Sequence, residues 1–239
     1  MSEIFEGSVR ISANSKGKKR LLPICICIED SELIRKKEIK YNIKKIHTEI
    51  CNICRNETNM DIKLRFSAFS EKDVVTLSKF SSVEDIDIDR LMNNVESLLN
   101  FEGSKNVRLF DCIRNEFTNI ARQKQKSDNS YKPIIFLIGS GGSDKGIKEM
   151  PERIISDLYA GRAILLIKPI SDDKSELKVY NALSNLNSNN TMFKADESLD
   201  DCIEKFAVSV EMMSRSTAAN YDAIENNDPN KSGEWKELT

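Results

Sequence analysis

Three short, uninterrupted runs of apolar residues constrain the fold of this chain more than any other feature. They are residues 21–28 (LLPICICI), 134–138 (IIFLI) and 163–167 (AILLI). Runs of this length, rich in branched side chains, are typical of strands that are buried on both faces of a parallel sheet. We therefore expect these three segments to be the inner strands of one sheet.

The segments between these runs have the spacing of helices. Apolar residues recur at helical intervals from Leu33 to Ile53, and Ser31 stands before them as the expected N-cap. Further helices are predicted over residues 87–100, 106–124, 147–159, 177–186 and 199–214.

Shorter alternating segments complete the predicted sheet. Residues 62–69 and 74–80 alternate on either side of a polar turn and predict a hairpin, and residues 191–194 predict a short edge strand. Buried strands that alternate with helices predict a doubly wound α/β fold. We expect a mostly parallel central sheet with helices on both faces and one antiparallel edge strand.

The domain organisation follows from composition. We expect one domain over residues 20–216, a polar lead-in over residues 1–19, and a disordered polar tail over residues 217–239 that carries the single tryptophan, Trp235. The formal net charge is −2, so no global basic field attracts nucleic acid. No apolar run approaches the roughly 20 residues of a membrane helix, and the N-terminal MSEIFEGSVR is not a signal peptide. These observations predict a cytoplasmic protein that is not in a membrane.

Six cysteines and one histidine offer few catalytic or metal-ligating groups. In a protein without a secretory signal the cysteines are expected to be reduced and buried. Cys51 and Cys54 share a helix face with His47, but a structural zinc site needs four ligands and the isoleucines of the same helix occupy the same stripe. We interpret this set as core packing, with a zinc site as the alternative.

Parallel strands bring the loops at their carboxyl ends to one crevice. Three loops are expected to meet there, one after each of the first and second buried strands and one before the helix at residue 106. Their candidate binding residues are Glu29, Asp30, Ser31, Ser104, Lys105, Asn106, Ser140, Ser143 and Asp144.

The order of elements, with an acidic-Ser loop first and a short Gly-containing loop after the second buried strand, resembles a von Willebrand factor A-type (vWA) domain. More narrowly, residues 20–216 resemble the bacterial group associated with tellurite-resistance and stress gene clusters, and residues 203–210 (IEKFAVSV) are similar to that group's last helix. In the family, three loops hold one divalent cation at the metal-ion-dependent adhesion site.

This chain departs from the family's metal-binding pattern. Glu29 stands at the first Asp and Ser31 matches, but Leu33 replaces the second Ser, Lys105 replaces the Thr and Ser140 replaces the Asp. A leucine and an ammonium group in the first shell do not suit Mg²⁺, which takes oxygen ligands. We therefore predict a metal-free, degenerate site without a cofactor. The alternative is a divalent ion held by altered ligands, because a shift of the alignment by one residue would let Asp30 or Asp144 restore some of them. We further hypothesise that the Lys105 ammonium occupies the place of the cation and faces Glu29, Ser31 and Ser140. The alternative is that Lys105 points into solvent at the start of a helix.

The resemblance implies a non-catalytic scaffold that binds other proteins. Domains of this bacterial group are encoded beside a protein kinase and a PP2C-type phosphatase in stress-response or phage-defence settings. It follows from the resemblance that the partners are proteins, a nearby kinase or phosphatase among them.

Two other functions remain as alternatives. The loop of residues 139–143 (GSGGS) follows a buried strand and precedes a helix, which is a setting for binding a nucleotide or a phosphate. The spacing of the Walker A motif fails, however, because Gly146 follows Lys145. A hydrolase would need a nucleophile elbow and a usable histidine, and the only histidine is His47.

Overall fold

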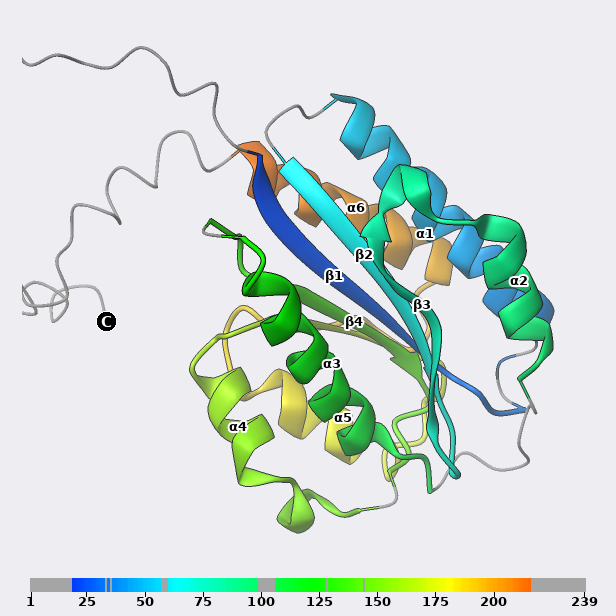
Figure 1. Ribbon diagram of the computed structural model, residues 1–239. Coiled ribbons are helices and arrows are strands. Elements are labelled where there is room, and N and C mark those ends of the chain that lie inside the picture. The colour runs from blue at the N-terminus through cyan, green and yellow to red at the C-terminus, as the bar shows by residue number, and fades with distance from the viewer. Residues whose placement is uncertain are drawn as a thin grey trace, which may run out of the picture.

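The computed structural model of the chain describes residues 19–32, 34, 36–56, 60–98, 106–127, 129–143 and 145–215. Six strands form one sheet in the order β3-β2-β1-β4-β5-β6 (Figure 1). The strands are β1 (Arg20–Glu29), β2 (Met60–Phe69), β3 (Val74–Ser82), β4 (Ile134–Gly139), β5 (Ile164–Pro169) and β6 (Thr191–Met192). All neighbours are parallel except β2 and β3, which form an antiparallel hairpin at one edge. The predicted fold class is confirmed, and the three predicted inner strands are β1, β4 and β5.

Helices cover both faces of this sheet (Figure 1). One layer consists of α1 (Lys36–Asn56), α2 (Ile88–Glu96) and α6 (Leu199–Arg215), and the other of α3 (Leu109–Lys124), α4 (Glu152–Tyr159) and α5 (Leu177–Ser184). Two short 3-10 turns, η1 (Val83–Asp85) and η2 (Ile147–Glu149), precede α2 and α4. Within the described part of the chain, none of the helices has the length and apolar character needed to cross a membrane. The predicted tail, including Trp235, and all of the predicted lead-in except Lys19 lie outside the described residues.

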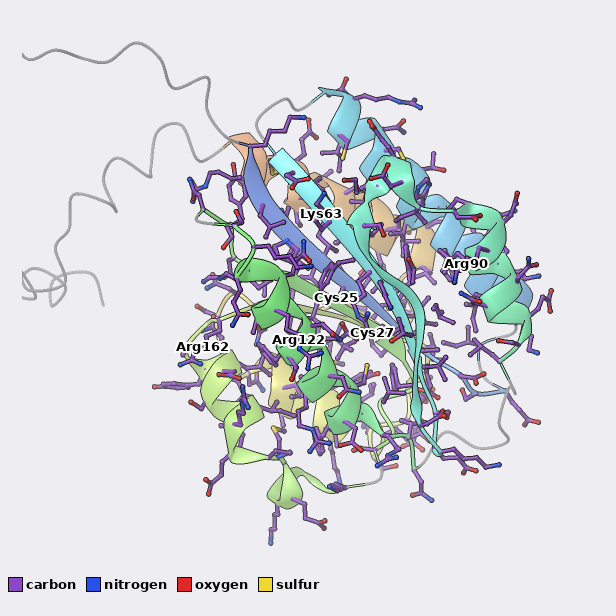
Figure 2. The ribbon with its side chains drawn as sticks, viewed as in Figure 1. Cys25, Cys27, Lys63, Arg90, Arg122 and Arg162 are labelled. Carbon is purple, nitrogen blue, oxygen red and sulfur yellow. The ribbon has the colours of Figure 1, made fainter. Side chains whose placement is uncertain are left out.

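The position of β1 in the middle of the sheet explains why its sequence is apolar without alternation. Successive side chains of a strand point to opposite faces, so Ile24 and Ile26 pack under α1 and α6 while Cys25 and Cys27 pack in the α3 layer. Figure 2 shows the two cysteines on β1, in the part of the sheet that α3 crosses in this view. By the same alternation Glu29, at the end of the strand, belongs to the face of the cysteines. The last residue of β1 thus carries a carboxyl group into the α3–α5 layer.

The first long helix begins later than the sequence indicates. Ser31 is not its N-cap, because α1 starts at Lys36. The chain stays with the sheet beyond β1, where the Asp30 N–H donates to the Phe69 carbonyl at 2.8 Å and Ser31 forms a β-bridge. The pairing with the end of β2 takes precedence over the capping preference of serine, and it leaves Ser31 fully buried.

The helix predicted over residues 147–159 is also wrong in part. The segment forms η2, ends, and restarts as α4 directly after Pro151. A proline has no N–H to donate to the preceding turn and its ring clashes with that turn, so it is tolerated at a helix start but not inside a helix. The remaining predicted helices correspond to α2, α3, α5 and α6, with ends shifted by a few residues.

His47 and the two cysteines of its helix face are half-buried against the core. His47 Nε2 lies 2.9 Å from the Val83 carbonyl oxygen and 3.7 Å from Cys51 Sγ. Burial raises the pKa of the Cys54 thiol to about 11, so this thiol is protonated at neutral pH. Nowhere in the described ranges are three or more His, Cys, Asp or Glu side chains grouped so that they could hold a metal ion.

Candidate functional site

The carboxyl ends of β1, β4 and β5 meet at one edge of the sheet, where the crevice is expected. The structure buries four of the predicted site residues there, namely Glu29, Asp30, Ser31 and Ser140. The other two described candidates, Asn106 and Ser143, are exposed and partly exposed. Ser104, Lys105 and Asp144 lie outside the described residues, and so does the predicted contact of Lys105 with Glu29.

Glu29 and Ser140 join the first and third loops directly. The backbone N–H and the hydroxyl of Ser140 both donate to Glu29 Oε2, at 2.6 and 2.8 Å. The same hydroxyl accepts the N–H of Gly142 at 3.2 Å. Both side chains are fully buried, so these bonds fasten the end of β1 to the loop after β4.

Four buried side chains at this edge, from Glu29, Ser31, Ser140 and Tyr180, make up one cluster. Tyr180 lies on α5, and sequence reasoning missed it. A Cβ atom on Gly139 would lie 2.7 Å from Glu29 Oε2 and 2.7 Å from the Tyr180 hydroxyl oxygen, so only glycine leaves room for both groups. Gly141 has a positive φ of 97°, and a Cβ there would lie 2.8 Å from the Glu176 carbonyl oxygen. The two glycines are thus required by packing against α5. The only signal for Tyr180 in the sequence is its place on the apolar face of a predicted helix.

The cluster is short of hydrogen-bond partners. Glu29 Oε1, Ser31 Oγ and the Tyr180 hydroxyl are buried and meet hydrogen-bond geometry with no atom of the described residues. Burial raises the pKa of Glu29, although the nearby hydroxyl of Ser31 and the two donors of Ser140 act in the opposite direction. Burial, and after it the charge of Glu29, raises the pKa of Tyr180 as well. The environment therefore favours the neutral form of both groups.

A divalent cation does not fit the donor set described here. Mg²⁺ and Ca²⁺ take six or more oxygen ligands, with carboxylates among them and usually waters. Glu29 and Asp30 are the two buried carboxylates described at this edge. Oε2 of Glu29 is already bound twice by Ser140, and burial raises the pKa of this carboxyl group. Glu29, Ser31 and Ser140 are all 0% exposed, which leaves no face for ligand waters.

The loop after β4 is equally unsuited to cradle a phosphate. Phosphate-binding loops point free backbone N–H groups at the anion. Here the N–H of Ser140 is bound to Glu29 and that of Gly142 to the Ser140 hydroxyl. The Glu29 carboxyl occupies the place that an anion would take, so the geometry does not favour the nucleotide alternative.

The raised pKa of Glu29 predicts a pH dependence of stability. The folded protein holds the proton of Glu29 more tightly than the unfolded chain does, so this residue's contribution to the free energy of unfolding falls as pH rises from about 4.3, the ordinary carboxyl pKa, through the raised native pKa. Glu29→Gln cannot titrate. The stability of the wild type minus that of Glu29→Gln is therefore expected to decline across this window and then to level off.

Urea denaturation of both proteins between about pH 4 and 8 measures this difference. All other titrating groups cancel in the comparison. A difference that stays constant, or one that grows with pH, would show that the carboxyl group is not held in its neutral form.

Beside this cluster, on the opposite face of the sheet, the structure has an open hollow of about 740 Å³. It lies between the start of α1, the ends of β4 and β5, and the start of α6. Its apolar lining is contributed by Ile34, Ile138, Ile170, Ala195 and Leu199. Polar side chains surround this apolar part, from Glu38, Asn42, Lys168, Glu197, Ser198 and Asp200. Concave apolar surface with a few polar groups is the usual form of a binding site.

Lys168 is a buried cation in the wall of this hollow. It is 3% exposed, and its ammonium group donates to the carbonyls of Lys194 and Ala195, at 2.8 and 3.0 Å. Burial lowers its pKa from the ordinary value. The lysine fastens the loop before α6 to the end of β5 and places a cation beside the apolar side chains of the hollow.

Tyr41 forms the rim of the hollow. Its side chain is 56% exposed, which makes it one of the few large apolar side chains at the surface of the described residues. Its hydroxyl donates to Asp200 Oδ2 at 3.3 Å, and Lys45 pairs with Oδ1 of the same aspartate at 2.9 Å. These contacts tie α1 to α6 at the rim of the hollow.

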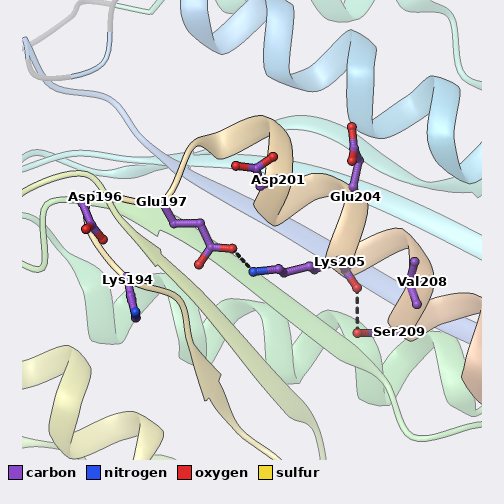
Figure 3. A pocket seen from close by; sticks show the side chains of 8 residues that line it. All are labelled: Lys194, Asp196, Glu197, Asp201, Glu204, Lys205, Val208 and Ser209. Atoms are coloured by element: carbon purple, nitrogen blue, oxygen red, sulfur yellow. Dashed lines mark hydrogen bonds and ion pairs between the residues drawn. The ribbon is translucent and has the colours of Figure 1, made fainter.

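A second, similarly large hollow has a different character. Figure 3 shows it along the outer side of α6, where Lys205 pairs with Glu197 and accepts a hydrogen bond from Ser209 at its carbonyl. Four carboxylates line it, from Asp196, Glu197, Asp201 and Glu204, and Val208 is its one apolar side chain. It is an acidic surface groove without an apolar anchor point, so we place the candidate site at the hollow beside Tyr41.

No protein-family model matches the chain, and no curated protein matches it. Its fold is similar to that of several solved structures. A mutant PilB minor pilin from Streptococcus sanguinis aligns with a TM-score of 0.55 and 10% identity, over 82% of this chain and 62% of the pilin. The VWA domain of SpRpn10 aligns with a TM-score of 0.52 and 14% identity, over 78% and 95% of the two chains.

A third similar structure is the manganese-loaded TRAP protein of Plasmodium vivax. It aligns with a TM-score of 0.51 and 11% identity, over 79% of this chain and 74% of TRAP. At such low identities the likeness concerns the fold alone. The fold is vWA-like, which confirms this part of the sequence-based resemblance.

Proposed function

We propose that this chain is a non-catalytic protein-binding module and that its partner docks at the hollow beside Tyr41. The observation that carries the proposal is the combination of an apolar floor, a buried polar group and an exposed aromatic rim at one end of the sheet. Exposed tyrosines beside apolar pockets are frequent hot spots of protein interfaces. The vWA-like fold is consistent with such a role.

We also propose that binding does not require a metal and that no reaction takes place at this edge. The carboxyl group of Glu29 serves instead to connect two loops, and the pairing with Ser140 supports this role. In this proposal the cluster of Glu29, Ser140 and Tyr180 keeps the edge of the sheet in one arrangement while the neighbouring hollow binds the partner.

The biological setting is the finer part of the proposal. The sequence resemblance to the bacterial stress-cluster group supports a role as a cytoplasmic scaffold in a stress-response or phage-defence complex. A protein kinase or a PP2C-type phosphatase encoded nearby is then the proposed partner. We also propose that the site is a degenerate adhesion site in which Lys105 faces Glu29.

Affinity capture from the native host tests the proposed site. The test bait is the double variant Tyr41→Ala/Leu199→Ser. The control bait is Tyr159→Ala, which removes a tyrosine that is 74% exposed on α4. Truncation of a hot-spot residue typically costs about 2 kcal/mol or more of binding free energy. We expect the wild type and the control to retain the same partner and the double variant to lose it by at least about tenfold.

Two results would contradict the proposal. One is equal retention of the partner by the double variant and the control. The other is a rise in melting temperature with ATP, with or without Mg²⁺, that exceeds the effect of the same ionic strength of salt, because this would favour the nucleotide alternative.

A further inference from the structure

A third hollow, far from the proposed docking site, is lined by cations and amides. It is a groove of about 570 Å³ between β3 and α3. Its floor contains Arg65, one wall contains Lys79 and Phe80 of the edge strand, and the other wall is the side of α3. Among the lining residues that the structure describes, four are cationic and none carries a carboxylate. The groove therefore has the opposite charge to the one in Figure 3, although the chain as a whole has a net charge of −2.

Three of the four cations of this groove have no counter-ion among the residues that the structure describes. Arg65 is buried and paired with Glu116 at 2.8 Å, so it contributes little net charge. By contrast, the side chains of Lys79, Arg122 and Lys126 are exposed and have neither a hydrogen bond nor an ion pair with any residue the structure describes. Figure 2 shows Arg122 on α3. Three uncompensated positive charges around one groove attract anions.

The wall formed by α3 carries a row of amide side chains. Asn115, Asn119 and Gln123 form this row at intervals of four residues, Arg122 lies next to it on the helix, and Lys126 follows in the turn after the helix ends at Lys124. Residues four apart lie on one face of a helix, about 6 Å from each other along its axis. Alternate residues of an extended peptide repeat every 6.6–6.8 Å, roughly the same distance.

We propose that this groove binds an acidic peptide segment in extended conformation. The amides of Asn115, Asn119 and Gln123 are spaced to pair with the backbone of every second peptide residue, since each carries both a donor and an acceptor. Lys79, Arg122 and Lys126 receive the carboxylates, and the half-buried ring of Phe80 supports the aliphatic parts of the peptide. Nucleic acid is the less favoured occupant, because it calls for a basic stripe along a domain that is basic as a whole.

Fluorescence anisotropy with a labelled, alternating glutamate–serine octapeptide tests the proposal, at an ionic strength of about 50 mM where screening is weak. The wild type is expected to bind this peptide and not its glutamine–serine counterpart. Lys79→Glu/Arg122→Glu is expected to lower the affinity at least about tenfold. Lys44→Glu/Lys148→Glu changes the net charge equally at exposed positions outside the groove and is expected to lower it less than about twofold.

Asn119→Ala separates peptide recognition from simple attraction of charge. It leaves every charge in place, so a several-fold loss of peptide affinity supports pairing with the peptide backbone. An unchanged affinity for Asn119→Ala, or an equal loss in both charge-reversed proteins, would overturn the proposal. Tighter binding of a short oligothymidylate than of the acidic peptide would overturn it as well and would assign the groove to nucleic acid.

Discussion

Replacing Glu116 by Gln is expected to lower the free energy of unfolding by about 3–5 kcal/mol. Glu116 is 0% exposed, and its Oε2 accepts a hydrogen bond from Arg65 Nε at 2.8 Å. The Arg65 guanidinium, also buried, donates in addition to the Thr76 hydroxyl at 2.8 Å. Removing the carboxylate leaves the guanidinium charge buried without a counter-ion, and the cost of desolvating a charge is then no longer offset. Chemical denaturation measures the loss.

The double variant Arg65→Met/Glu116→Leu is the decisive comparison. A buried ion pair replaced by apolar side chains of similar volume often leaves stability unchanged, so the double variant is expected to be more stable than Glu116→Gln alone. Arg114→Met, which removes a largely exposed partner of Asp111, is expected to cost less than about 1 kcal/mol. If the double variant loses as much stability as the sum of the losses measured for Arg65→Met alone and Glu116→Leu alone, the two residues do not act as a buried pair.

Phe206→Ala is expected to lower the free energy of unfolding by about 3–5 kcal/mol. The Phe206 ring stacks on Phe136 of β4 with centroids 5.1 Å apart, and Phe193 meets Phe136 edge-on at 6.1 Å. All three rings lie in the core between the sheet and α6, so truncation leaves a cavity and removes an aromatic contact. Val208→Ala, on the exposed side of the same helix, is expected to change stability by less than about 0.5 kcal/mol.

Denaturation midpoints and slopes of both α6 variants test this expectation. A loss below about 1 kcal/mol for Phe206→Ala would mean that α6 is not an integral part of the core. The hollow beside Tyr41 depends on the placement of α6, so this outcome would also weaken the proposed docking site.

The parts of the fold that the sequence predicted share one physical basis. β1, β4 and β5 are buried on both faces, so their side chains are apolar along most of each strand. Such apolar runs can be recognised from the local sequence alone. Helical periodicity located the buried stripes of α1 and α3 for the same reason. Local preferences failed where a long-range contact decided the outcome, as when pairing with Phe69 at the end of β2 kept Ser31 out of the first helix.

The sites were harder to predict than the fold. The sequence placed Glu29 and Ser140 at one edge, because strand ends reveal which loops meet, and the structure brings them into contact. It could not reveal Tyr180 or the pairing of Arg65 with Glu116, because each depends on the packing of a helix against a distant strand. The spacing of apolar residues predicts which faces of helices and strands are buried. It does not predict the hollows that side chains leave between these elements.

The most direct measurement of the proposed function is site-specific photo-cross-linking in the native host. A photoreactive phenylalanine analogue replaces Tyr41 at the rim of the hollow, or Tyr159 on α4 as the matched control, since both side chains are more than half exposed. The proposed function predicts one discrete cross-linked protein from position 41 that is absent from position 159. A discrete cross-link from position 159 alone, or none from either position, would contradict a protein partner at the hollow beside Tyr41.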